Sequence, residues 1–142
     1  MIGDDVNLEV VAFLICDSVV RDATSGKTSV QGIFDTVNAA NTPAVQAGMT
    51  VYFRLKFEQH VANATASLAI QPPSGIRHIT PDLPLVNVGP TGATEGWINI
   101  QGMVFPEYGM YGIDLLINGE TKAHNFLIVQ KPGAAPYGSQ LN

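Results

Sequence analysis

Apolar residues recur at every second position along much of this 142-residue chain. In MTVYFRLKFEQ (residues 49–59) the apolar set is Val51, Phe53, Leu55 and Phe57, and the polar set alternating with it is Tyr52, Arg54, Lys56 and Glu58. A period of two places the two sets on opposite faces of a β-strand, whereas a helix would spread the apolar set around its circumference. The segment therefore predicts a half-buried strand with one polar face.

A second strong signal is the Asn118-Gly119 pair, which lies between two strand-like runs near the C-terminus. Both residues tolerate the positive φ that a type I′ turn requires, so the pair predicts a β-hairpin. The incoming strand would carry one apolar row on a single face, namely Tyr111, Ile113, Leu115 and Ile117. We expect the returning strand over about residues 122–130.

The remaining segments also favour strands. EGWINIQGMVFPEYG (residues 95–109) alternates, NATASLAIQPPSG (residues 63–75) ends at a Pro-Pro pair, and residues 76–96 contain three prolines that suit a loop-rich edge. EVVAFLICDSVV (residues 9–20) fits a buried helix or a strand by periodicity, and its β-branched and aromatic content favours a strand. We therefore predict an all-β fold, a single-domain antiparallel β-sandwich of seven or eight strands.

The short motif GMYG at residues 109–112 resembles the Gly-x-Tyr found near the penultimate strand of immunoglobulin-like sandwiches. In that fold a tyrosine hydroxyl ties a corner of the chain to the backbone. Tyr108 and Tyr111 are both candidates for this role. The resemblance implies that the predicted sandwich is immunoglobulin-like in outline.

Length and cysteine content indicate one domain without an intrachain disulfide, since the chain has a single cysteine. We assign the β-sandwich to residues 1–130 and a Gly/Pro/Ala-rich C-terminal tail to residues 131–142. The acidic N-terminal stretch does not have the positive charge of a signal peptide, and no apolar run approaches the ~20 residues that span a bilayer. We therefore expect a cytoplasmic protein, or one in a particle assembled in the cytoplasm, without membrane insertion.

The charge balance bears on the choice of partners. The chain has 7 basic and 12 acidic residues and a formal net charge of −5. Phosphate contacts dominate nucleic-acid affinity, so we do not expect nucleic acid as a partner. The charged fraction is 13%, against about 25% in typical soluble domains. Either the faces of an ordinary β-protein are neutral, or neighbouring subunits cover much of the surface.

The single cysteine, Cys16, precedes Asp17 at the end of an apolar run. A nucleophilic cysteine needs a lowered pKa, which a helix N-terminus, a histidine or a cation supplies. An adjacent carboxylate would instead raise the pKa, and a thiol in an apolar strand packs as a small hydrophobe. We therefore predict a structural role for Cys16.

No cofactor or metal motif is expected. The glycines of GPTGATEG (residues 89–96) lack the spacing of a phosphate loop, and one cysteine cannot supply a structural zinc site. Asp17, Asp22 and Asp35 are carboxylates of the kind that bind calcium. In a hairpin about Ser25-Gly26, however, Asp17 and Asp35 would be roughly 7–10 Å apart at ~3.3 Å per residue. Solvated or turn-capping roles are therefore expected for these carboxylates.

A longer stretch of the chain resembles an uncharacterised bacterial domain family. FLICDSVV, SVQGIFDTV and NTPAVQAGMTVYFRL are similar to its strand ending in Cys-Asp, its Gly-x-Phe-Asp segment, and its Pro-Ala-Val segment with a following alternating strand. The matching positions, which include a Gly-Lys turn, are Cys16, Asp17, Gly26, Lys27, Gly32, Phe34, Asp35, Pro43, Ala44 and Val45. The resemblance covers residues 12–57 and returns at residues 108–120. It implies an immunoglobulin-like sandwich and no particular activity.

Three functions compete on the sequence. The first is a non-enzymatic binding module, whose candidate interaction face is Tyr52, Arg54, Lys56 and Glu58, because Tyr and Arg are favoured in interface centres. The second is a structural or decoration subunit of a phage particle or other large assembly, with Asp4-Asp5 and the tail as arms. The third, an enzyme, is not expected, because no acid–base or nucleophile constellation can be assembled from spacing. A protein partner or self-association is expected in either of the first two cases.

Overall fold

The protein is an all-β domain of two sheets, described by a computed structural model over residues 6–133. The four-stranded sheet has the order β2 (Thr28–Ile33), β1 (Leu8–Arg21), β4 (Ala44–Phe57) and β8 (Thr94–Phe105). The six-stranded sheet has the order β3 (Thr36–Asn38), β10 (Glu120–Gln130), β9 (Gly109–Ile117), β5 (Val61–Gln71) and β6 (His78–Ile79), and β7 (Leu83–Val88) also pairs with β5. The all-β prediction is confirmed.

The described residues contain ten strands, where the sequence predicted seven or eight. Two of the ten, β3 and β6, have only three and two residues, which is too short for an alternating pattern to show. The region predicted to be a loop-rich edge contributes β6 and β7, and both pair with β5 at the edge of the six-stranded sheet. The segment that fitted either a helix or a strand lies in the long strand β1.

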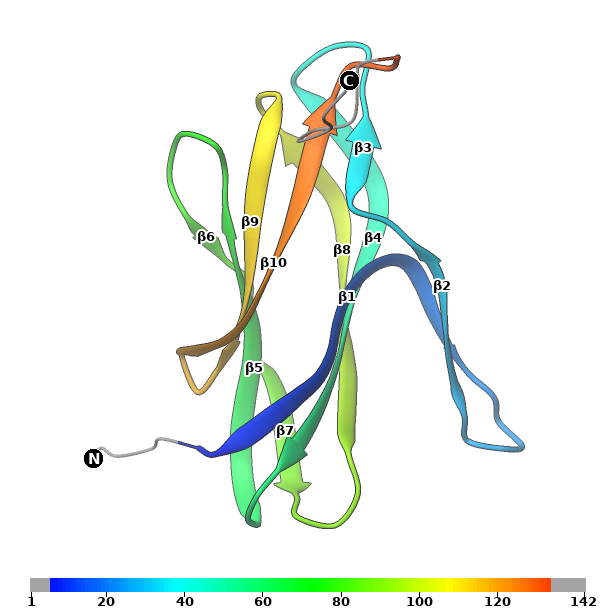
Figure 1. Ribbon diagram of the computed structural model, residues 1–142, viewed down its shortest axis with the longest axis vertical. Coiled ribbons are helices and arrows are strands. Elements are labelled where there is room, and N and C mark those ends of the chain that lie inside the picture. Colours follow the sequence, from blue (N-terminus) through cyan, green and yellow to red (C-terminus); the bar gives the residue numbers. More distant parts are fainter. Residues whose placement is uncertain (1–5, 134–142) are drawn as a thin grey trace, which may run out of the picture.

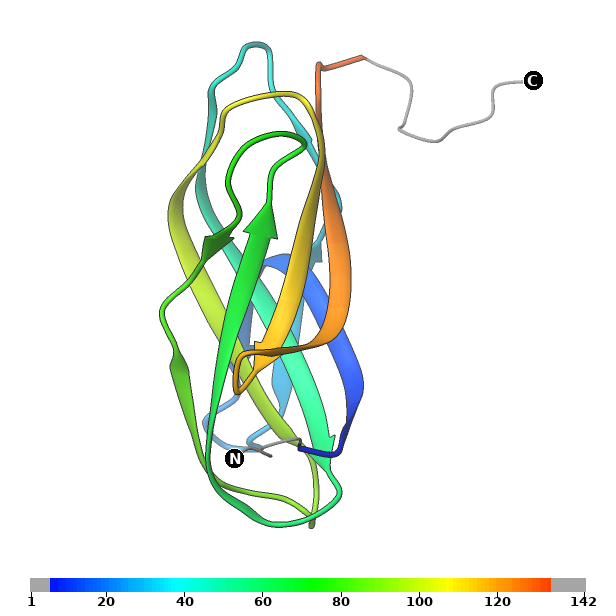
Figure 2. The same cartoon turned by 90° about the vertical axis from the view of Figure 1, so that its left-hand side faces the viewer.

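The two sheets face one another across one hydrophobic core (Figures 1 and 2). Both apolar rows predicted from the sequence lie in this core and are almost fully buried: Val51, Phe53, Leu55 and Phe57 on β4, and Tyr111, Ile113, Leu115 and Ile117 on β9. Position 96 on β8 requires glycine, because a Cβ there would lie 2.7 Å from the Phe53 ring. The alternation therefore fixes which face of each central strand is inside.

The predicted hairpin at Asn118-Gly119 joins β9 to β10. Both turn residues have positive φ, 53° and 80°, as a type I′ turn requires. The register then shifts by one residue between Thr121 and Ala123. This irregularity decides which side chains of β9 and β10 lie opposite one another further along the pair.

Two features tie the ends of the sheets together. Strand β3 pairs with β10 in parallel, which brings the chain after β2 onto the six-stranded sheet. The Tyr111 hydroxyl donates to the Glu107 carbonyl at 2.7 Å, so the predicted tyrosine-to-backbone hydrogen bond is present. The other candidate, Tyr108, donates instead to the Ala39 carbonyl at 2.8 Å. Both tyrosines thus fix the connection between β8 and β9.

Strand β10, the last described strand, ends at Gln130. Most of the predicted tail (residues 134–142) and the acidic pair Asp4-Asp5 lie outside the described residues. Within residues 6–133 no helix has the length and apolar character needed to cross a membrane.

Candidate interaction face

The outer face of the four-stranded sheet carries the side chains predicted as an interaction face. Arg54, Lys56 and Glu58 are exposed, as expected of a polar strand face. Tyr52 differs, because only 6% of it is exposed. The predicted set is therefore divided: Tyr52 is covered, whereas Arg54, Lys56 and Glu58 are exposed. Arg54 nevertheless shares a hydrogen-bond acceptor with Tyr52.

The cover over Tyr52 is the chain's own β1–β2 hairpin. Along β1, Ala12 lies opposite Arg54 on β4, and Arg54 lies opposite Glu95 on β8. Nine residues further along β1, Arg21 contacts Glu95 again. Strand β1 must therefore reverse its direction over the outer face, and Figure 1 shows it arching away from β4 before it meets β2. We call residues 17–33 the folded-back hairpin.

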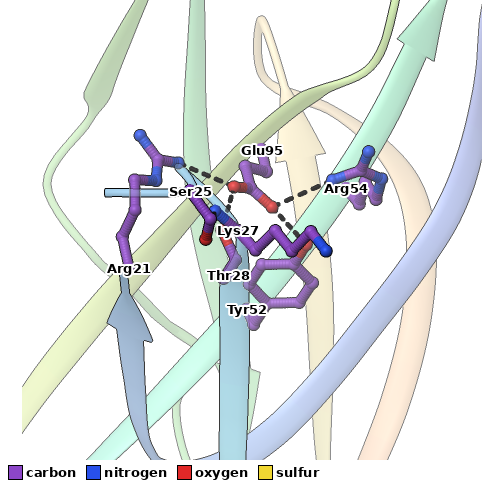
Figure 3. Close-up of polar contacts among 7 residues, drawn as sticks. All are labelled: Arg21, Ser25, Lys27, Thr28, Tyr52, Arg54 and Glu95. Atoms are coloured by element: carbon purple, nitrogen blue, oxygen red, sulfur yellow. Dashed lines mark hydrogen bonds and ion pairs between the residues drawn. The ribbon is translucent and has the colours of Figure 1, made fainter. Parts of the chain in front are cut away.

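Glu95 holds the hairpin to the sheet (Figure 3). Its Oε1 accepts hydrogen bonds from Arg21 Nη2 at 2.7 Å and from the Thr28 hydroxyl, both in the hairpin. Its Oε2 accepts from the Tyr52 hydroxyl at 2.5 Å and from Arg54 Nη1 at 3.0 Å, both on β4. The carboxylate therefore accepts two bonds from each side and joins the two layers.

The surroundings keep Glu95 ionised. Burial alone would raise the pKa of Glu95, but hydrogen bonds from Thr28, Tyr52 and Arg21 outweigh burial and hold it below its ordinary value. Burial and the bond to Glu95 raise the pKa of the Tyr52 hydroxyl. The Arg21 guanidinium also lies 5.4 Å from the centre of the Trp97 ring, within cation–π distance. With four donors on one carboxylate, Glu95 serves as a structural acceptor.

Cys16 lies in the bend that starts the folded-back hairpin. It is fully buried, and its Sγ is 3.4 Å from the Thr50 carbonyl oxygen. Burial and the neighbouring Asp17 carboxylate raise the pKa of the thiol, as predicted from the sequence. The prediction that Cys16 is buried is confirmed, although it lies under the hairpin and not between the two sheets.

The three aspartates considered from the sequence as calcium ligands, Asp17, Asp22 and Asp35, have different contacts. Asp22 caps the turn by accepting from the Thr24 amide at 3.0 Å and the Ser25 hydroxyl at 2.8 Å, and these bonds lower its pKa. Asp17 lies over Gly32, where an added Cβ would come within 2.2 Å of Asp17 Oδ2. Asp35 accepts from the Thr36 hydroxyl. Residues 6–133 contain no group of three His, Cys, Asp or Glu side chains placed to hold a metal ion.

The outer face of the six-stranded sheet carries two exposed apolar side chains. Phe126 on β10 is 40% exposed and Met110 on β9 is 39% exposed. Gly112 lies directly opposite Phe126 on the neighbouring strand. We call Met110, Gly112 and Phe126 the open apolar face.

A polar pair borders the open apolar face. His124 Nδ1 lies 2.5 Å from Asp114 Oδ1, and Arg77 Nη2 lies 3.9 Å from Asp114 Oδ2. A regular hairpin about Asn118-Gly119 would place Asp114 opposite Ala123. The one-residue shift after Thr121 brings His124 opposite instead. The period-two pattern gave no sign of this pair, and only the bulge creates it.

The protein is thus an all-β domain of two sheets, with a polar cluster around Glu95 on one outer face and exposed apolar side chains on the other. Residues 11–130 match the family described as Family of unknown function (DUF6941), and the chain belongs to this family. Membership confirms the resemblance to an uncharacterised domain family drawn from the sequence. No curated protein matches the chain.

Among solved structures, the chain is similar to an alkylpurine DNA glycosylase of Pseudomonas fluorescens bound to DNA containing an abasic-site analogue. The TM-score is 0.55 and the sequence identity is 10%. The similarity covers 87% of this chain and 30% of the glycosylase chain, so the chain spans less than a third of that protein. At this identity the likeness concerns the fold alone.

Proposed function

We propose that the protein is a non-enzymatic interaction module on an immunoglobulin-like β-sandwich. The fold assignment is supported by three features: the facing sheets, the parallel pairing of β3 with β10, and the tyrosine corner formed by Tyr111 and the Glu107 carbonyl. Such sandwiches present loops and sheet faces to partners. The binding role is supported by one face in particular.

The open apolar face carries the proposal. Phe126 and Met110 are exposed on central strands, where a monomer has no structural need for them. Aromatic residues and Met are enriched in interface centres, and charged residues such as Lys and Glu are depleted there. The neighbouring polar groups, His124 and Asp114, are already paired with one another and suit the polar rim. A protein partner therefore fits this face better than the face predicted from the sequence.

The chemistry of the reactive groups supports a role without catalysis. The Cys16 thiol is buried with a raised pKa, which disfavours the thiolate that a nucleophile needs. The Glu95 carboxylate is occupied by four donors. Neither group is placed to transfer a proton or attack a substrate.

We propose protein and not nucleic acid or membrane as the partner. The net charge of −5 opposes phosphate binding. Arg21 and Arg54, which lie together on one face, are both paired with Glu95. The proposed location is the cytoplasm or a particle assembled there.

The test compares the native mass of complexes that contain the full chain or its variants, isolated gently from its own source. We expect the unchanged chain in a complex heavier than a dimer of the 15.1 kDa chain, and Phe126→Ser absent from it. Val86→Ser, which alters an exposed residue on β7 of the same sheet, is the matched control and should be retained. Recovery of the unchanged chain only as monomer or dimer would overturn the proposal, and so would equal retention of both variants.

The second candidate function is a structural or decoration subunit of a phage particle or other large assembly. The low charged fraction, 13%, favours it, because surfaces between subunits carry few charges. The same isolation distinguishes the two functions. A fixed stoichiometry within one large particle would support the structural subunit, whereas exchange with a soluble partner would support the module.

A further inference from the structure

The edge strands of the two sheets differ in how they are protected. Unpaired backbone groups at a sheet edge invite pairing with another chain, and proteins limit this with short strands, charges or prolines. The edge strands β3 and β6 have three and two residues, and β2 and β7 have six each, with Pro84 in β7. Strand β8 has twelve residues. It is the long edge of the described part of the chain.

Strand β8 has none of the usual protection along most of its length. It contains no Lys, Arg or Pro, and its only charged residue is Glu95, which is engaged under the folded-back hairpin. Strand β8 keeps one register with β4 from Thr94 to Phe105, and its one irregularity is the positive φ of Gly102. On the other side of β8 the sheet order gives no neighbour among residues 6–133. Beyond Glu95, an edge without charged residues is therefore open to another strand.

An apolar pocket of about 320 Å³ lies beside this edge, where the two sheets part. Ile100 and Met103 of β8 line one wall, and Ile70 and Thr80 line the opposite wall from the β5 side. Figure 2 shows β8 along one margin of the molecule. A strand added to β8 would cover this pocket with its own side chains.

We propose that the occupant is a second copy of this chain, with β8 paired antiparallel to β8 about a two-fold axis. Such an interface is self-complementary, because each residue near the axis meets itself or a close neighbour. Like charges directly opposite are destabilising in a strand pair, but residues 96–105 carry no charge. The four-stranded sheet would then continue across the dimer. This interface is separate from the open apolar face on the other sheet.

The test is the mass of the purified full chain by sedimentation equilibrium, over about 1 μM to 1 mM, the range of modest affinities. We expect a concentration-dependent dimer of twice 15.1 kDa. Asn99→Lys with Gln101→Lys places two charges on the edge of β8 and should leave a folded monomer. The matched control is Ser29→Lys with Gln31→Lys on the β2 edge, where two exposed polar residues have the same spacing. It should dimerise like the unchanged chain.

Amide hydrogen exchange gives a second readout that does not depend on the variants. Exchange of the β8 amides that do not bond to β4 should slow by at least several-fold between the dilute and concentrated chain. A monomer throughout the range, or dimers in both lysine variants, would overturn the proposal. Loss of the dimer in Phe126→Ser with its retention in the β8 variant would assign the contact to the other sheet and also overturn it. If the unchanged chain stayed monomeric but bound a different protein through Phe126, the proposed function would be supported and the β8 dimer would be overturned.

Discussion

The two sheets of this protein differ in what covers their outer faces. On the four-stranded sheet, the folded-back hairpin lies over the central strand, and the mid-sheet aromatic residue Tyr52 is only 6% exposed. On the six-stranded sheet the corresponding aromatic residue, Phe126, is 40% exposed. The covered aromatic residue thus lies on the more polar strand face, whereas the other sheet leaves an aromatic residue exposed. Polarity of a strand face therefore does not by itself tell which surface meets a partner.

The covered face is polar, so its cover must satisfy every buried polar group. Within the described residues, no buried side-chain nitrogen or oxygen lacks a hydrogen-bond partner. Glu95 achieves this by accepting from both layers. A buried polar network stabilises a fold only when it is fully satisfied. The network that binds the hairpin should therefore stabilise the fold much less if one of its members is removed.

The largest expected effect is the difference in stability lost when each of the two aromatic side chains is truncated. Tyr52→Ala should reduce the free energy of unfolding by about 3 kcal/mol, because it empties a buried site and removes a donor to Glu95. Phe126→Ala should cost about 1 kcal/mol or less, as for other partly exposed positions. Urea unfolding of the full chain measures both values. Equal losses would mean that the hairpin does not cover Tyr52 in solution.

A smaller effect is expected at Glu95 and should depend on pH. Glu95→Gln should cost about 2 kcal/mol at neutral pH, allowing for the half-exposed arginines. The pKa of Glu95 is lowered on folding, so the carboxylate stabilises the fold above its unfolded pKa of about 4.3. That contribution is lost as the pH falls through the lower folded value. The difference between the unchanged chain and the variant should therefore narrow in acid.

The matched control for this prediction is Glu58→Gln, on an exposed residue just beyond the end of β4. It should change stability by no more than about 0.5 kcal/mol. Unfolding midpoints followed by the fluorescence of the single tryptophan, Trp97, give both series across pH. A constant difference between the unchanged chain and Glu95→Gln at every pH would contradict the role assigned to the carboxylate.

The smallest effect concerns access to the thiol in the bend of β1. In the folded chain, Cys16 should be alkylated far more slowly than free cysteine, because it is fully buried and its pKa is raised. Glu95→Gln should increase the rate several-fold by loosening the hairpin above it. Intact mass after timed alkylation measures the rate, and the unfolded chain in urea supplies the upper limit. Reaction of the unchanged chain at that limit would show that the hairpin is not docked.

Much of the fold follows from local rules in the sequence. Alternation around Phe53 fixed the inner face of β4, and Asn118-Gly119 fixed the last hairpin, because both signals act over a few residues. The hairpin about Ser25-Gly26 was also expected from its turn residues. Strands β3 and β6 were not foreseen, since their few residues are held by pairing with distant strands and not by their own pattern.

The covered cluster could be predicted only in part. Tyr52 and Arg54 were chosen as surface residues from the strand pattern, and the pattern placed them correctly on the outer face of β4. Their partner Glu95 is 41–43 residues away along the chain, and the reversal of β1 that brings Arg21 to it leaves no signal in hydrophobic periodicity. The Asp114–His124 pair was missed for a similar reason, since it depends on a single-residue shift in register.

The folded-back hairpin also affects the order in which the chain can fold during its synthesis. Arg21 and Thr28 bond to a carboxylate that lies 74 and 67 residues later in the chain. A ribosome that adds about 5–20 residues per second makes the hairpin roughly 4–15 s before its anchor exists. During that interval the hairpin cannot be held over Cys16 and β4 by Glu95. The hairpin is thus made early but docks late. A nascent chain stalled before Glu95 would expose the Cys16 thiol, which is buried in the finished protein.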